Sequence, residues 1–124
     1  MTQTEEFHGA AGQMRQSEWL AAEDIRGHGD VNAVIAGVYV SRNVEFEGGL
    51  KKPVVHSIAF VGKERKLIVN AARRKVLVKA RGSNVDNWIG CTVTMYVDET
   101  VKMKGQAVGG IRFRPEVIPA GEAK

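Results

Sequence analysis

The side chains that could do chemistry in this sequence are mainly cationic and aromatic. Residues 51–81 contain ten Lys or Arg and one Asp or Glu, whereas residues 1–30 contain two Lys or Arg and six Asp or Glu. A local block of positive charge attracts a polyanion even where the net charge of the chain is modest, here +4. The charge pattern therefore favours a polyanion as ligand.

Two tyrosines offer a second kind of contact. A protein that binds single-stranded nucleic acid without sequence preference combines a cationic groove with aromatic rings on which bases stack. Tyr39 and Tyr96 are each the only aromatic residue on the solvent-facing side of their predicted strands. If those strands are neighbours, the two rings form a stacking platform. The alternative is a structural role, in which both rings pack at the rim of the fold against the N-terminal arm.

The remaining candidates border the predicted groove. We expect the phosphate contacts to come from cations on loops and strands, namely Lys51, Lys52, Lys102, Lys104, Arg112 and Arg114. Trp88, in the segment DNWIG, completes the predicted nucleic-acid-binding set, with packing against a helix as its alternative. The basic residues of the predicted helix are left open as a surface for a protein partner.

Catalytic chemistry has little support in the sequence. His8, His28 and His56 lack the spacing of metal ligands, and no nucleophile has an evident base. The single cysteine, Cys91, has no second cysteine with which to form a disulfide or share a metal, which fits a reducing compartment. We therefore expect no enzymatic activity, no cofactor and no metal.

Length and hydropathy indicate one cytoplasmic domain. No stretch approaches the roughly 20 apolar residues of a membrane helix, and the N-terminus is acidic and polar, unlike a signal peptide. We expect a flexible arm over residues 1–16, a domain over 17–115 and a flexible tail over 116–124.

The hydrophobic pattern predicts strands around one helix. Asn70 can cap a helix over 71–81, and Gly82 can end it. In the long first strand, Gly37 marks a bulge, and one parity is expected to face the core, namely Val34, Ala36, Val38, Val40, Val44 and Phe46. A short helical turn is expected over 17–25, and strands are expected over 31–46, 53–61, 67–69, 91–97 and 111–114.

This order predicts a mainly β, five-stranded OB-like Greek-key barrel with one helix between strands 3 and 4. The exposed sheet face and loops of OB-folds bind oligonucleotides or oligosaccharides. An antiparallel sheet with a different curvature would give the same order of elements along the chain.

Three segments carry a family resemblance. The runs KKPVVHSIAFVG, KLIVNAARRK and DNWIGCTVTMYVDETVKMKGQAVGGIRFRP resemble small phage and prophage proteins encoded near replication and recombination genes, which are similar in element order to single-stranded DNA-binding OB proteins. The resemblance covers roughly residues 17–115 and implies the cytoplasm of a host cell. The chain ends in PAGEAK and lacks the acidic, Phe-tipped tail of the bacterial single-stranded DNA-binding proteins. The resemblance therefore does not extend to recruitment of replication enzymes through the C-terminus.

These observations lead to the expectation of a phage-type protein that binds single-stranded DNA without base-specific readout, alongside phage recombination or replication proteins. The first alternative is a protein-interaction module that docks an acidic partner in phage recombination or host-defence evasion. A virion structural protein is a further alternative. The sequence leaves open DNA versus RNA and whether the protein forms a homo-oligomer.

Overall fold

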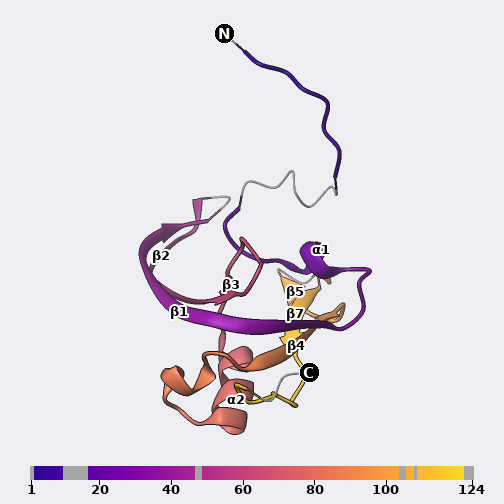
Figure 1. The fold of residues 1–124 in the computed structure, drawn as a ribbon. Coiled ribbons are helices and arrows are strands. Elements are labelled where there is room, and N and C mark those ends of the chain that lie inside the picture. Colours follow the sequence, from indigo (N-terminus) through magenta and orange to yellow (C-terminus); the bar gives the residue numbers. More distant parts are fainter. Residues whose placement is uncertain (1, 10–16, 47–48, 104–105, 108, 122–124) are drawn as a thin grey trace.

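The computed structural model describes residues 2–9, 17–46, 49–103, 106–107 and 109–121. These residues form a short helix, a basic helix and an antiparallel sheet (Figure 1). The helical elements are α1 (Ala22–Ile25), α2 (Ala71–Arg81) and the 3-10 helix η3 (Val85–Trp88). The strands are β1 (Val31–Glu45), β2 (Lys51–Phe60), β3 (Leu67–Ile68), β4 (Thr92–Asp98), β5 (Lys102–Met103), β6 (Gln106–Ala107) and β7 (Gly110–Phe113).

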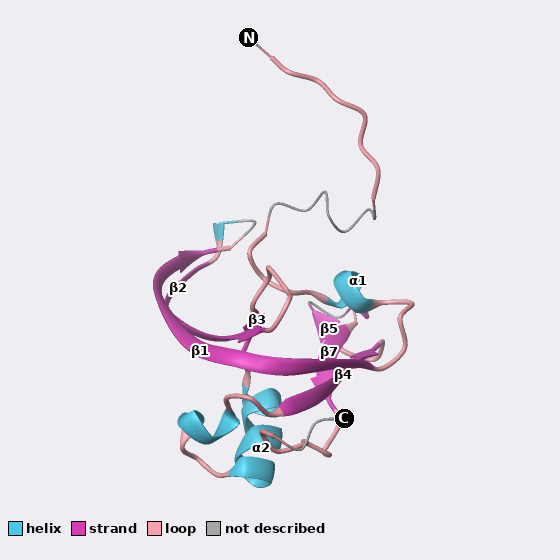
Figure 2. Cartoon of the chain, viewed as in Figure 1, coloured by secondary structure: helices cyan, strands magenta, loops and turns pink. Residues whose placement is uncertain are grey.

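Five strands form one antiparallel sheet in the order β3-β2-β1-β4-β7, and β5 pairs with β6 in a separate two-stranded sheet (Figure 2). The mainly β architecture is confirmed, as is the helix between the third and fourth strands of the five-stranded sheet. The sheet is not closed, because β3 and β7 are its two edges and do not pair with each other. A closed barrel is therefore not present.

The long first strand contains the expected bulge, and its inward face is the opposite of the predicted one on the N-terminal side of that bulge. The register with β2 shifts between Ile35 and Gly37. Ala33 and Ile35 are buried, whereas Val40 is 48% exposed. The predicted core side was therefore wrong for Val34, Ala36 and Val40. It was right beyond the bulge for Val44, which is buried, and for Phe46, which packs against the same cluster. A bulge adds one residue to one strand and changes which side chains face inward beyond it, so a single alternation cannot describe the whole strand.

Helix α2 begins and ends where the sequence predicts. The Asn70 side chain accepts a hydrogen bond from the backbone N–H of Arg73 at 2.8 Å, and Gly82 adopts φ +85°, which only glycine adopts readily. The basic residues of this helix, left open above as a surface for a protein partner, are not all exposed. Leu77 is fully buried, and Arg73 is partly buried four residues before it, on the same side of the helix. Arg73 therefore does not belong to the exposed cationic surface.

The main core lies between the sheet and α2. Ile35, Ile58 and Met95 of the sheet pack in one cluster with Leu77 of α2 and Trp88 of η3. A second, smaller cluster is formed by Trp19, Val44 and Val55, with the Trp19 and Phe46 rings 6.1 Å apart. The smaller cluster packs within the curved β1–β2 hairpin, and the main core packs against α2.

The predicted C-terminal tail is in part docked. Ile118 and Thr92 exchange two backbone hydrogen bonds of 2.8 and 2.9 Å, and Val117 packs against the main core. The chain therefore continues to contribute to the domain beyond residue 115. At the other end, residues 2–9 are exposed and extend away from the sheet (Figure 1).

Candidate nucleic-acid interface

Tyr39 is the clearest candidate for base stacking. Its side chain lies on β1 next to the bulge and is 50% exposed. The ring covers the backbone of Gly37 so closely that a Cβ at residue 37 would lie 3.0 Å from the Tyr39 hydroxyl oxygen. The Lys66 Nζ lies 5.5 Å from the ring centroid, within the range of a cation–π contact. An exposed ring is thus held flat beside a positive charge.

Tyr96 is in a different environment. The Arg114 guanidinium stacks on the Tyr96 ring at 3.8 Å from its centroid. Arg114 also donates two hydrogen bonds to the Asp30 carboxylate, at 3.0 and 3.1 Å. These bonds lower the pKa of Asp30 and raise the pKa of Arg114. One face of the Tyr96 ring is therefore occupied, and the cation that covers it is already paired.

The two tyrosines do not form a common platform. β1 and β4 are neighbours, as expected, but they pair with Val31 opposite Met95. Tyr39 instead lies opposite Ser57 of β2, eight residues further along β1 than Val31. Eight residues of strand span about 26 Å. The predicted shared platform is therefore wrong, because the pairing register places Tyr96 beside the start of β1 and Tyr39 near the middle of that strand.

The arginines of β7 and the residue after it are also paired. The Arg112 Nε donates to the Asp98 carboxylate at 2.5 Å. Thr100 donates two further hydrogen bonds to Asp98, and these, with Arg112, lower the pKa of the carboxyl group. Arg112 and Arg114 thus each hold a carboxylate, and a phosphate of a nucleic acid strand would have to compete with it.

The lysines of the predicted groove are more accessible. Lys51 and Lys52 are exposed at the start of β2, where Lys52 lies five residues, about 16 Å, from the Tyr39 partner Ser57. Lys102 on β5 is exposed as well. Lys104 lies outside the described residues.

Trp88 has to be withdrawn from the predicted set. Only 3% of the residue is exposed, and its indole Nε1 donates to the Gly82 carbonyl at 2.9 Å. The ring joins the end of α2 to the core, so the alternative of packing against the helix describes it. A base could stack on Trp88 only if this end of the domain opened.

The site therefore centres on a smaller set of residues, which we name the hairpin surface and define as Tyr39, Arg42, Lys51, Lys52 and Lys66. Arg42 was missed by the sequence analysis and is exposed on β1 opposite Val54. The signal that could have found Arg42 is its charge on the same long strand as Tyr39, although in a regular strand residues three positions apart face opposite sides.

The arrangement also bears on the basic helix. Figure 1 shows α2 at the opposite end of the molecule from the tip of the β1–β2 hairpin. The exposed helix residues Arg74, Lys75 and Lys79 are thus separated from the hairpin surface. The block of positive charge in the sequence is divided between two surfaces.

Comparison of the chain with models of protein families, with curated proteins and with solved structures gave no match. Among the described residues, no helix is long and apolar enough to cross a membrane. The same part of the chain contains no group of three or more His, Cys, Asp or Glu residues arranged to hold a metal ion.

Proposed function

We propose that the protein binds single-stranded DNA, with little sequence preference, along the hairpin surface. The observation that carries the proposal is the half-exposed Tyr39 ring with the Lys66 ammonium group 5.5 Å from its centroid. Every base has a π face, so stacking on one ring does not select a sequence. In this interpretation the open sheet is an incomplete OB-like barrel, and the phage resemblance suggests replication or recombination as the setting.

The cations of the hairpin surface supply the electrostatic part of binding. Lys66, whose ammonium group lies over the Tyr39 ring, would turn toward a phosphate when a base stacks there, and Arg42, Lys51 and Lys52 lie further along the hairpin toward its tip. Each Lys or Arg that contacts a phosphate releases counterions, so the logarithm of the binding constant falls with the logarithm of salt concentration by about 0.7 per contact. Three or four contacts give a slope of about −2 to −3.

The test is fluorescence anisotropy of labelled oligo-dT across a series of salt concentrations, with duplex DNA as the control. Tyr39→Ala should weaken binding by about 1–3 kcal/mol. Its effect on stability should be small, because the ring is half exposed. The matched control is Tyr96→Ala, which removes the ring on which Arg114 stacks. This change should lower stability without weakening oligo-dT binding by the folded protein. Absence of binding to oligo-dT at roughly 50 mM salt would refute the proposal.

The second candidate is a module that docks an acidic protein, and the exposed face of α2 favours it. Arg74, Lys75 and Lys79 accompany Val78, which is 38% exposed, at the end of the molecule away from the hairpin surface. Cations around an exposed apolar side chain suit an acidic partner with a hydrophobic anchor. The double substitution Lys75→Glu and Lys79→Glu separates the two functions. If α2 docks an acidic partner, the double variant should no longer bind a fluorescent poly-glutamate probe. If the hairpin surface binds single-stranded DNA, the double variant should bind oligo-dT as the wild type does.

A further inference from the structure

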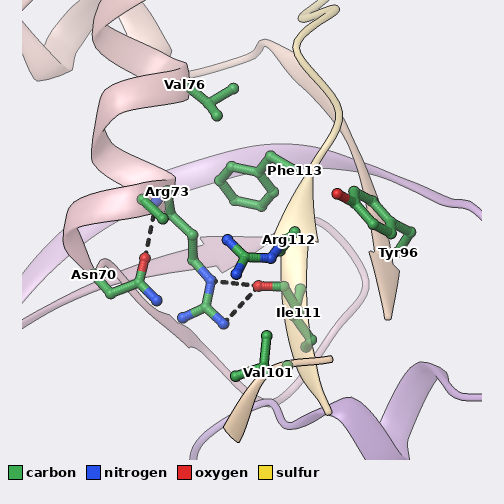
Figure 3. Close-up of a pocket in the computed structure, with 10 residues that line it drawn as sticks. Asn70, Arg73, Val76, Tyr96, Val101, Ile111, Arg112 and Phe113 are labelled. Atoms are coloured by element: carbon green, nitrogen blue, oxygen red, sulfur yellow. Dashed lines mark hydrogen bonds between the residues drawn. The ribbon is translucent and has the colours of Figure 1, made fainter. Parts of the chain in front are cut away.

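A pocket of about 320 Å³ lies between the first turn of α2 and strand β7, away from the hairpin surface (Figure 3). One part of its wall is apolar and includes Val76, Val101 and Phe113. Another part is formed by the guanidinium groups of Arg73 and Arg112, which extend into the same space between α2 and β7. Two cations thus share a small, partly enclosed volume.

Arg73 is held in place entirely by neutral acceptors. Its Nε and Nη2 donate to the Ile111 carbonyl at 3.0 and 2.8 Å, and its Nη1 donates to the Ile68 carbonyl at 2.8 Å. These bonds use three of the five N–H groups of a guanidinium. Within the described part of the chain, Arg73 has no carboxylate as an ion-pair partner. The group is therefore fixed in orientation, but its charge is not neutralised.

Arg112 also retains donors. Its Nε pairs with Asp98, and its two Nη atoms make no hydrogen bond to the described residues. Burial, with a contribution from the nearby Arg112 charge, lowers the pKa of Arg73 to about 10. Two guanidinium groups therefore face the pocket, and none of the residues that line it is acidic; the Asp98 carboxylate, bonded to Arg112, is not among them.

We propose that this pocket binds a phosphate-type oxyanion between Arg73 and Arg112, with the apolar wall against the organic part of the ligand. A tetrahedral phosphate presents several oxygens to planar N–H forks approaching from two directions, which is the geometry in which arginine binds phosphate strongly. The dipole of helix α2 adds positive potential at its first turn, which contains no acidic residue to offset it. The pocket volume falls in the range of small-molecule sites.

The site is tested on the full chain with inorganic phosphate as the probe. Phosphate should raise the melting temperature more than sodium chloride of equal ionic strength, because a ligand that binds only the folded state stabilises it. Isothermal titration calorimetry gives the affinity. Arg112→Gln should weaken phosphate binding about 10- to 100-fold, the effect of losing a charged hydrogen-bond donor. The inference is wrong if phosphate acts like chloride, or if Arg112→Gln binds phosphate as the wild type does.

A second variant changes affinity in the opposite direction, so that loss of folding cannot imitate the result. Asp98→Asn removes the carboxylate that partly neutralises Arg112 and should tighten phosphate binding severalfold. Weaker or unchanged binding by a folded Asp98→Asn protein would also overturn the inference.

A final comparison distinguishes two sources of the phosphate group. If the ligand is the terminus of a nucleic acid strand, 5′-phosphorylated oligo-dT should bind more tightly than the same strand with a 5′-hydroxyl, and Arg112→Gln should remove the difference. Equal binding of the two strands, with phosphate binding intact, assigns the pocket to a free phosphate-bearing molecule. The phosphate titration does not depend on the hairpin surface, so either proposal can fail without the other.

Discussion

Arg73 joins the two edges of the open sheet, and its replacement should destabilise the fold. Its guanidinium donates to Ile111 of β7 (Figure 3) and also to Ile68 of β3, and these are the strands that would have to pair directly in a closed barrel. The informative change is Arg73→Met, which keeps a long apolar stem and removes every donor. The two carbonyl groups would then lose the side chain that connects them.

The size of the effect follows from two opposing contributions. Hydrogen bonds from a charged donor each contribute about 1.5–3 kcal/mol, so three contribute roughly 5–9 kcal/mol. Against this, the fall in the pKa of Arg73 from 12.5 to about 10 corresponds to a cost of about 3 kcal/mol for holding the charge there. The difference leaves about 2–6 kcal/mol in favour of arginine. A domain of this size should then lose roughly 10–20 °C in melting temperature.

Chemical denaturation and thermal melting measure this difference directly. Arg74→Met is the matched control, because Arg74 is exposed on the next position of the same helix, and its change should stay within about 0.5 kcal/mol. Arg73→Lys should be nearly as destabilising as Arg73→Met, since one ammonium group cannot reproduce a fork between two carbonyl groups. An Arg73→Met protein as stable as the wild type, or more stable, would refute this reasoning. It would mean that desolvation of the guanidinium outweighs its bridging role, as in some buried ion pairs.

Four further outcomes are expected. Folding lowers the pKa of the Asp30 carboxyl through its bonds to Arg114. The stability that this carboxylate contributes is therefore present above the unfolded pKa, near 3.8, and is lost as the pH falls through the folded pKa. Asp30→Asn should flatten the decline in melting temperature below about pH 4. Trp88→Ala should cost about 3–5 kcal/mol in urea unfolding, because a fully packed indole is removed. Deleting residues 116–124 should lower the melting temperature, since the pairing of Ile118 with β4 is lost, and an unchanged melting temperature would show that the pairing contributes nothing. Gly37→Ala should displace the Tyr39 ring, visible as changed chemical shifts of the ring protons, and should weaken oligo-dT binding more than it lowers stability.

The sequence by itself determined the local structure. The ends of α2 were predictable because Asn70 satisfies a free backbone N–H and Gly82 adopts a positive φ, and both effects act within one helical turn. The inward side of β4 was predictable for a similar reason. Val93 and Met95 are fully buried and alternate with the more exposed Thr94 and Tyr96, so a period of two describes the middle of the strand.

The tertiary structure decided which of these elements face each other. The bulge at Gly37 reversed the inward side of β1, and the register of β1 with β4 separated Tyr39 from Tyr96. Arg73 could have been assigned to the inner side of α2, because it lies four residues before the buried Leu77. Its partners could not have been predicted, because Ile111 lies 38 residues away on a strand whose position depends on the whole sheet. Bulges, registers and sheet edges are set by the sum of many long-range contacts, and no local pattern in the chain records that sum.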